Sequence, residues 1–467
     1  MKQTILHYLL SACVVVLMTA CGADYLDIND NPNVATRPPL DGLLASASYN
    51  TAQNQFRVSN GHAAYYVQYL ASPNEGNTTD TYLEISNGIA WGELYDVMTD
   101  LDDLIRFGQE DGLGRHVAIA KVLMAINLGL VVDNWGNAPF SDAFSGETLR
   151  PTYDSAEDLY ATIFRLLNEA TSELAAAADA PDVRSGSDFV YDGDLELWTR
   201  AAASLRARYL NHLSETSQYD PSAVLAAVDA GFTGPEQDAA VTSFTVRNPW
   251  AQVADNNANL LLGGWLSEQF IDALNGTTYG TEDPRLPLLT NRNDDGEFVG
   301  TPNGAGRQGD GTKTLESYLV LDGAFSMESS PLNIITYAEL KFIEAEAALA
   351  AGNQERANEA FAEGVRTSMS QIGVDDQSAT DYIAAEYGSD DVTRDDIFRE
   401  KYVAIFLSPE TWVDARRYDY AYADFELAEN AALNTFPVRI QYPNTETDRN
   451  AANVPVVTMT DPIFWDQ

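Results

Sequence analysis

The strongest constraint on the fold is a pair of helical patterns between residues 336 and 371. Apolar residues recur there at steps of three and four: Ala338, Phe342, Ala345 and Leu349, then Ala357, Phe361 and Val365. Each spacing places one apolar stripe along a helix face. Gly352 and Asn353 lie between the two patterns, where they are expected to end the first helix and cap the second. The sequence therefore predicts two helices that pack on each other.

Similar helix pairs are expected at about 40–71, 87–134 and 154–216. The chain has 467 residues and exceeds the limit of roughly 300 for one compact core, so an extended array of helix pairs fits it best. Ala360 and Gly364 allow close approach of large neighbours, as in tetratricopeptide repeats; a generic helical hairpin explains the same pattern equally well. The predicted fold class is all-α, with helix pairs and long irregular loops.

The longest irregular segment is a loop-rich region at about 232–331, which we expect to face a ligand. Long loops inside a compact protein are usually functional or disordered. Disorder is a poor explanation here, because disordered segments contain few aromatic residues. The expected loops of this chain carry Tyr82, Trp250, Trp265, Tyr279 and Tyr318.

The first twenty residues have the features of a secretory signal peptide. Lys2 precedes a largely apolar run that is too short to span a bilayer and that ends in small residues. The sequence Leu17-Met18-Thr19-Ala20-Cys21 resembles a bacterial lipobox, which predicts cleavage before Cys21 and acylation of its sulfur; an ordinary secretory signal is the alternative. Cys13 leaves with the signal, so the mature chain, 21–467, is expected to contain no disulfide.

The longest apolar run after the signal is Val117–Val132. It contains Lys121 and Asn127 and is short for a bilayer. We therefore predict a helix that is buried in the protein rather than one that spans a membrane.

The charge balance argues against nucleic acid as a partner. The sequence has 70 acidic and 27 basic residues, for a formal net charge of -43. A field of this sign repels phosphate backbones, and counterion release requires a stripe of Lys and Arg.

No motif in the sequence predicts catalysis. The mature chain holds only His62, His116 and His212, none at metal-ligand spacing, and it has no G-x-S-x-G or Walker motif. Two Asp/Asn-rich segments, 27–32 and 291–296, contain potential calcium ligands, but neither has the residues that the EF-hand pattern requires. We therefore expect that the protein is not an enzyme and that it binds no cofactor. A calcium ion held by irregular loops is the alternative.

Five segments in order resemble the SusD/RagB family of outer-membrane nutrient-binding lipoproteins, and more so its SusD-like group 2 branch. They are Asp24-Tyr25-Leu26-Asp27-Ile28-Asn29, Asp133-Asn134-Trp135-Gly136-Asn137-Ala138-Pro139-Phe140, Asp283-Pro284-Arg285-Leu286, Thr336-Tyr337-Ala338-Glu339, and Glu400-Lys401-Tyr402 onward to Arg417. In the second segment, Asn137 stands where the family pattern has Asp.

This resemblance implies a tetratricopeptide-like helical lipoprotein, anchored in the outer membrane and exposed at the cell surface. Such a protein would capture oligosaccharides and deliver them to a SusC-like TonB-dependent transporter. A peptide-binding lipoprotein and a helical envelope scaffold without glycan affinity are the alternatives. We interpret the family-marking residues as structural, namely Trp135, Tyr337, Glu339, Trp412, Asp414, Arg416 and Arg417.

Ligand-binding residues are expected in the loops, because sugars stack on aromatic rings while polar groups bind their hydroxyls. The candidates are Trp250, Tyr82, Asn77 and Asp80, followed by Trp265 and Asn257. Trp250 follows Asn248 and Pro249 in an expected loop, where an exposed ring and a buried anchor are equally compatible with the sequence. If the ring is exposed, Trp250→Ala should weaken glycan binding with little change in melting temperature.

Overall fold

The computed structural model describes residues 37–466, apart from 261–262, 310–314 and 389–390. The expected signal peptide, Cys21 and the first Asp/Asn-rich segment lie outside these residues. The described residues are mostly helical, with 52% helix and 5% strand, which confirms the predicted fold class.

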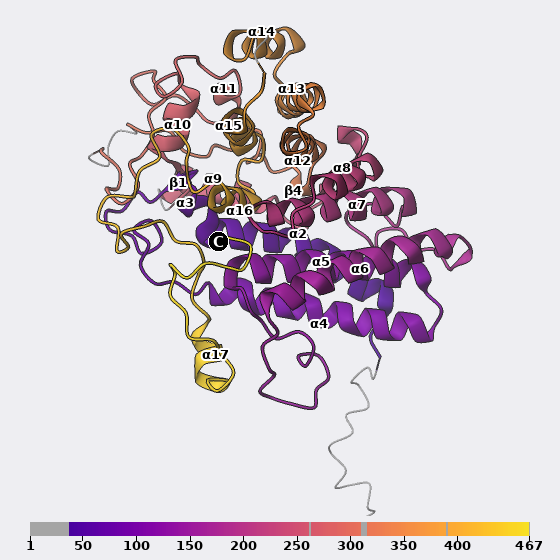
Figure 1. The fold of residues 1–467 in the computed structure, drawn as a ribbon. Helices are drawn as coiled ribbons and strands as arrows, with labels where there is room; N and C mark the ends of the chain where they lie inside the picture. Colours follow the sequence, from indigo (N-terminus) through magenta and orange to yellow (C-terminus); the bar gives the residue numbers. More distant parts are fainter. Residues whose placement is uncertain (1–36, 261–262, 310–314, 389–390, 467) are drawn as a thin grey trace, which may run out of the picture. The chain divides into compact units, whose positions relative to one another are not determined.

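Six helices form the first group, and they pack side by side (Figure 1). They are α2 (Leu40–Val58), α4 (Gly88–Glu110), α5 (Gly114–Trp135), α6 (Ala156–Ala176), α7 (Leu195–Asn211) and α8 (Pro221–Ala230). Helix α5 contacts α2, α4 and α6, and its residues from His116 to Gly129 are all buried. This helix is long and apolar enough to cross a membrane, yet its most apolar window is entirely buried in the protein, as expected for the run at 117–132.

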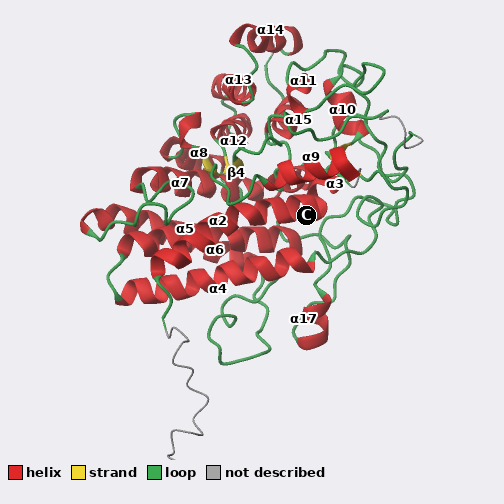
Figure 2. Ribbon diagram, turned by 180° about the vertical axis from the view of Figure 1, so that it is seen from behind, coloured by secondary structure: helices red, strands yellow, loops and turns green. Residues whose placement is uncertain are grey.

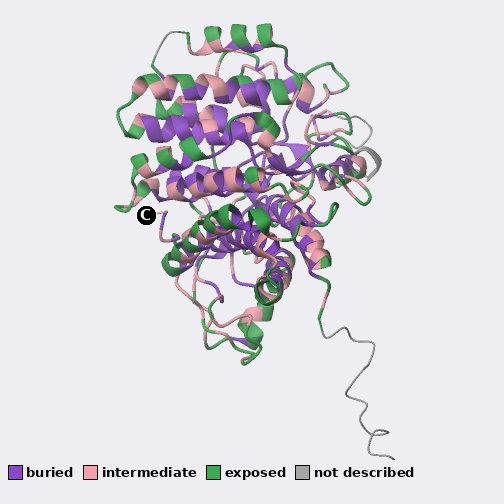
Figure 3. Cartoon of the chain, turned by 90° about the vertical axis from the view of Figure 1, so that its right-hand side faces the viewer, coloured by how far each residue is buried: buried purple, intermediate pink, exposed green. Residues whose placement is uncertain are grey.

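The second group contains the helix pair predicted most clearly from the sequence. It comprises α12 (Tyr337–Ala350), α13 (Gln354–Gln371), α14 (Asp376–Glu386), α15 (Arg394–Ala404) and α16 (Glu410–Arg417). The apolar stripes of α12 and α13 meet, and Gly364 leaves room for the ring of Phe342. Asn353 caps α13 by accepting a hydrogen bond from the backbone N–H of Arg356 at 3.2 Å. In both helix groups the buried residues face the neighbouring helices (Figure 3).

The shorter helical elements are η2 (Ser59–Ala63), α3 (Ala64–Tyr66), η3 (Ala177–Asp179), η4 (His212–Glu215), η5 (Pro235–Gln237), α9 (Pro249–Leu260), α10 (Glu268–Leu274), α11 (Leu286–Leu289) and α17 (Asn444–Arg449). Of these, α3, α9, α10 and α11 lie with irregular segments at one side of the long helices (Figure 2). Two antiparallel ribbons join β1 (Leu70–Ala71) to β3 (Trp265–Leu266) and β2 (Ala239–Val241) to β4 (Leu332–Ile335).

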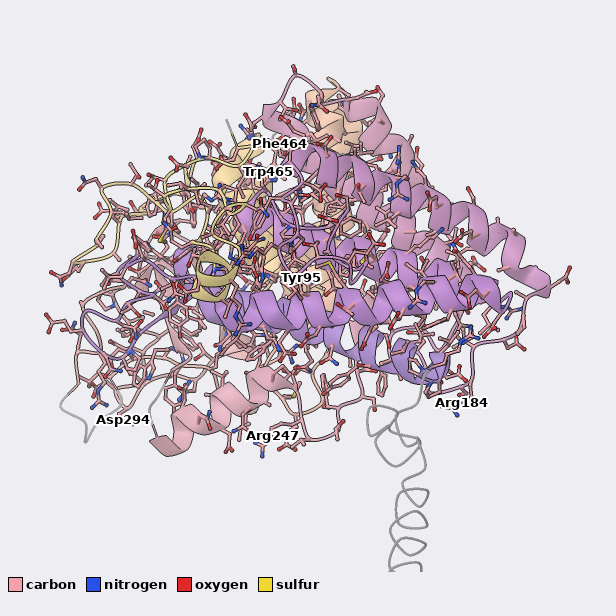
Figure 4. The ribbon with its side chains drawn as sticks, turned by 90° about the horizontal axis from the view of Figure 1, so that it is seen from below. Tyr95, Arg184, Arg247, Asp294, Phe464 and Trp465 are labelled. Carbon is pink, nitrogen blue, oxygen red and sulfur yellow. The ribbon has the colours of Figure 1, made fainter. Side chains whose placement is uncertain are left out.

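Helix α9 corrects the prediction of an irregular loop around Trp250. The side chain of Asn248 accepts a hydrogen bond from the backbone N–H of Trp250 at 2.7 Å, and Pro249 is the first helical residue. Asn before a helix and Pro at its first position are established start signals. Arg247 lies beside this helix, with its Nη1 3.1 Å from Asp255 Oδ2 (Figure 4).

The family-marking residues lie buried where distant segments meet. Arg208 on α7 forms a bidentate pair with Glu339 on α12, with both N–O distances at 2.6 Å. Arg417 on α16 pairs with Glu346 on α12, and its Nη1 lies 3.6 Å from Asp414 Oδ1. These ion pairs join α12 to the helices on either side of it.

Arg416 contacts both the first helix group, at Asp133, and the C-terminal part of the chain, at Val438 and Trp465. Arg416 Nη1 donates to the carbonyl oxygens of Asp133 and Val438, at 2.7 and 2.9 Å. Its guanidinium stacks 4.0 Å from the ring centroid of Trp412 and 4.6 Å from that of Trp465 (Figure 4). Trp135 also contacts the C-terminal part of the chain, because its Nε1 donates a hydrogen bond to the Gln441 carbonyl at 3.1 Å. The ring of Tyr337 faces the ammonium group of Lys341, one turn further along α12.

Candidate ligand-binding site

A polar pocket of about 350 Å³ opens between α10 and four irregular stretches of chain. Its lining comes from Gln68, Glu268, Gln269, Asp272, Thr277, Thr278, Pro302, Asn303, Asp424, Glu426, Leu427, Ala428 and Glu429. Hydroxyls, amides and carboxylates dominate this set, which suits a ligand with many hydroxyl groups.

The pocket is assembled by the β1–β3 ribbon and by two glutamines. Because Leu70 pairs with Leu266, Gln68 comes next to the start of α10. Gln68 Nε2 donates to the carbonyl oxygen of Glu426 at 2.6 Å, and Gln269 Nε2 donates to that of Ala423 at 3.0 Å. These two hydrogen bonds hold the C-terminal segment 423–429 against α10.

Asn303 is the most extensively bonded side chain of the pocket. Its Nδ2 donates to the Leu70 carbonyl at 3.0 Å and to Asp80 Oδ1 at 2.6 Å, while its Oδ1 accepts from Ser267 Oγ at 2.5 Å. Its backbone carbonyl accepts from the N–H of Glu429 at 2.8 Å. With every one of these groups engaged, Asn303 is held in one orientation at the pocket wall.

Asp80 lies fully buried beneath Asn303. Its Oδ2 accepts from the backbone N–H groups of Ser72 at 3.1 Å and Gly304 at 2.7 Å. Burial raises the pKa of Asp80 to about 6, although these hydrogen bonds act in the opposite direction. Gly304 has φ +83°, and a Cβ there would collide with the carbonyl of Glu429, so the close approach of the C-terminal segment requires glycine.

The pocket carries a strongly negative field. Five carboxylates line it, and they are those of Glu268, Asp272, Asp424, Glu426 and Glu429. Burial raises the pKa of Glu268, and the charges of Asp272 and Glu429 raise it further. Among the residues that the structure describes, no Lys or Arg lines the pocket. The pocket therefore disfavours anionic ligands.

Two of the six predicted ligand residues lie directly behind this pocket, and a third lies close by in sequence. Asp80 holds Asn303, and the hydroxyl of Tyr82 accepts a hydrogen bond from Gln68 Nε2 at 3.4 Å. Both side chains are fully buried, so they support the pocket wall. Asn77 closes the preceding turn, where its Oδ1 accepts from the N–H of Thr79 at 3.0 Å.

The other three predicted residues do not line the polar pocket. Trp250 is only 4% exposed and packs edge-on against Phe56, with ring centroids 4.8 Å apart, so the exposed alternative for this ring is wrong. Trp265 is buried beside Tyr318, and Asn257 Oδ1 accepts from the N–H of Gly263 at 2.9 Å. Ligand binding by any of the six residues stays a prediction.

Sequence reasoning missed the residues that line the pocket, above all Gln68, Gln269 and Asn303. Gln269, Asn303 and the two threonines lie in the predicted ligand-facing region at about 232–331, but no local signal distinguishes them there. Asn303 and Asp80 are 223 residues apart, and their contact depends on how distant segments pack.

The described residues contain no group of three or more His, Cys, Asp or Glu side chains arranged to hold a metal ion. In the second Asp/Asn-rich segment, Asn293 Oδ1 accepts hydrogen bonds from the N–H groups of Asp295 and Glu297, at 3.0 and 2.9 Å. This side chain therefore closes a turn.

Sequence comparison with protein families matches residues 32–443 to the SusD-like group 2 model, described as starch-binding and associating with the outer membrane. The chain belongs to the SusD-like family. This membership confirms the resemblance drawn from the five segments. SusD-like proteins bind carbohydrates and are not catalytic, in agreement with the prediction that the chain is not an enzyme. Among curated proteins, none matches the sequence significantly.

Solved SusD homologues share the fold of this chain at low sequence identity. A chitin-binding SusD homologue from Flavobacterium johnsoniae is 20% identical, with a TM-score of 0.78 over 92% of this chain and 98% of the homologue. A SusD/RagB family protein from Bacteroides thetaiotaomicron is 22% identical, with a TM-score of 0.72 over 92% and 99% of the two chains. At these identities the similarity establishes the fold.

Proposed function

We propose that this protein is a surface-exposed outer-membrane lipoprotein that binds oligosaccharides in the polar pocket and delivers them to a SusC-like TonB-dependent transporter. The observation that carries the proposal is the pocket itself, where the side chains of Thr277 and Thr278 stand among five carboxylates, in a wall that the hydrogen-bonded amides of Gln68 and Asn303 hold in place. Amides, hydroxyls and carboxylates bind sugar hydroxyls, and the membership in a family described as starch-binding supports this ligand class. The chitin-binding homologue supports it further.

The negative charge of the pocket favours uncharged or cationic glycans over anionic ones as ligands. Each uronate or sulfate group would approach five carboxylates with no basic residue of the described lining to offset them. Two unit charges 4 Å apart repel by about 1 kcal/mol even in bulk water, and several such pairs act together here. We expect oligogalacturonates to bind at least about tenfold more weakly than neutral oligosaccharides of equal length, with a smaller difference at high salt.

Isothermal titration of the purified chain with N-acetylchitooligosaccharides, maltooligosaccharides and oligogalacturonates tests this function. Thr277 lines the pocket from an exposed position, so Thr277→Trp should fill the pocket without removing a core contact. We expect at least a tenfold loss of affinity. Thr380→Trp, the same change on exposed α14, is the matched control. Absence of binding to every neutral glycan would refute the proposal and favour the scaffold or peptide-binding alternatives.

The anchor and the transporter partner rest on other observations. Mass spectrometry of the native protein should find acylated Cys21 as the first residue, because the lipobox directs cleavage there. Co-purification from outer membranes should recover a TonB-dependent barrel in a stable complex. If Cys21 is unmodified, the proposed lipid anchor is wrong. If the protein purifies without a barrel, the proposed transporter partner is wrong.

A further inference from the structure

A second cavity, of about 470 Å³, lies on the β2–β4 ribbon, and its lining shares no residue with the polar pocket. Asp238, Ala240 and Thr242 alternate along one face of the β2 segment, and Asn333 is the register partner of Ala240 on β4. Alternate residues of a strand point to the same face. These four side chains therefore form the floor of the cavity.

Space for the cavity remains above this floor because the large side chains of the ribbon point into the hydrophobic core instead. Ala239 and Val241 on β2, and Leu332 and Ile334 on β4, are all at most 4% exposed and join the hydrophobic core. The cavity face carries small or polar residues instead. The register of the ribbon shifts between Ala239 and Ala240, and Ile335 also lies in the core, so the cavity depends on this irregularity as well as on strand alternation.

Two aromatic rings and two aliphatic side chains form the walls. Tyr191 is held by a hydrogen bond from its hydroxyl to the Gln237 carbonyl at 2.6 Å and by edge-on packing against Trp198, with centroids 5.2 Å apart. Phe325 packs edge-on against Phe406 at 5.5 Å. Both rings are half-buried, and Leu197 and Ile372 complete the apolar walls. The aromatic surfaces are therefore in place before any ligand arrives.

The polar groups of this cavity include an amide, a hydroxyl and the carboxyl groups of Asp238 and Glu236. The side chains of Asn333 and Thr242 make no hydrogen bond to any residue that the structure describes, which leaves an amide and a hydroxyl available. Asp238 accepts from the N–H of Tyr337 at 2.6 Å, and burial raises the pKa of Asp238 to about 7. No Lys or Arg of the described chain lines the cavity to bind an anion.

We propose that this cavity is a second carbohydrate site, which binds an uncharged pyranose with one ring face on Phe325 and Tyr191 and its hydroxyl edge on Asn333 and Thr242. The polar pocket has no aromatic residue in its described lining and offers only polar groups, whereas this cavity adds aromatic faces on which the apolar face of a sugar ring can stack. The inference goes beyond the proposed function, because it concerns a separate site with its own contacts.

Two cavity-filling variants separate the sites. Thr242 is exposed and lines the second cavity, so Thr242→Trp should fill it as Thr277→Trp fills the polar pocket, with Thr380→Trp as the control for both. Each variant is titrated calorimetrically with N-acetylchitotriose and maltotriose, and its melting temperature is measured. We expect two sites in the unmodified chain for at least one trisaccharide, with a different site lost in each of the two variants.

The outcomes distinguish this inference from the proposed function. Binding that Thr277→Trp abolishes and Thr242→Trp leaves intact would overturn the second site and leave the polar pocket standing. Binding lost only in Thr242→Trp would support the second site and overturn the polar pocket. Asn333→Leu adds a chemical test, since it should weaken a sugar at least about tenfold by removing the amide. A trileucine peptide that binds in place of the trisaccharides, and more tightly to Asn333→Leu, would overturn the carbohydrate assignment.

Discussion

Asp80→Asn tests the electrostatics beneath the polar pocket, because it keeps the side-chain shape and removes the ability to ionise. The carboxyl of Asp80 is fully buried, and its pKa is about 6 in the folded protein against an ordinary 3.8. Because the pKa is higher in the folded state, protonation of Asp80 stabilises the fold. This contribution is complete below pH 3.8, the ordinary pKa, and is lost as the pH rises through 6, the folded pKa. The whole difference corresponds to about 3 kcal/mol, at 1.36 kcal/mol for each pKa unit.

The measurable part of this effect lies between about pH 5 and about pH 8, away from the sequence pI of 4.1. Asp80 contributes about 1.4 kcal/mol at pH 5, one unit below its folded pKa, and almost nothing at pH 8. Asp80 accepts hydrogen bonds from three buried donors, the N–H groups of Ser72 and Gly304 and the amide of Asn303. The NH₂ group of the variant cannot accept a hydrogen bond from the donor that it faces, which lowers the free energy of unfolding by about 1–3 kcal/mol at either pH. Asp80→Asn should therefore destabilise the protein about 1.4 kcal/mol more at pH 5 than at pH 8.

The assay is urea unfolding followed by circular dichroism, with the free energy of unfolding of variant and parent compared at each pH. Asp376→Asn, on exposed α14, is the control for the loss of one acidic group. An Asp80→Asn effect that is equal at the two pH values, or larger at pH 8, would refute the argument that burial opposes ionisation of Asp80.

Two further substitutions test buried contacts. Trp250→Ala should lower the free energy of unfolding by about 3–5 kcal/mol, because its buried ring packs on Phe56, and a melting temperature unchanged from the parent would contradict this packing. Arg208→Met should cost about 3–5 kcal/mol in chemical denaturation, because it leaves Glu339 buried without its cation. Arg106→Met, which breaks an exposed pair, should cost less than about 1 kcal/mol, and equal losses in both variants would refute the burial argument.

The sequence by itself determined the helical architecture and the family. Periodic apolar residues mark which face of a helix is buried, so the pairs around α4 with α5 and α12 with α13 followed from spacing alone. Capping is equally local, since the capping box that starts α15 needs only Thr393 and Asp396, three residues later. The Asn248-Pro249 start of α9 is also a local signal, but the residues around it lack a clear helical period, so spacing alone does not predict this helix.

Only the tertiary structure decided which residues share a pocket. Asn303 lies 223 residues after Asp80, and Glu426 lies 358 residues after Gln68. The hydrogen bonds within these two pairs form only when the β1–β3 ribbon and the C-terminal segment pack together. The second cavity likewise depends on the register of β2 with β4. Helix periodicity is encoded within one or two turns of chain, whereas a pocket depends on long-range packing that no local pattern records.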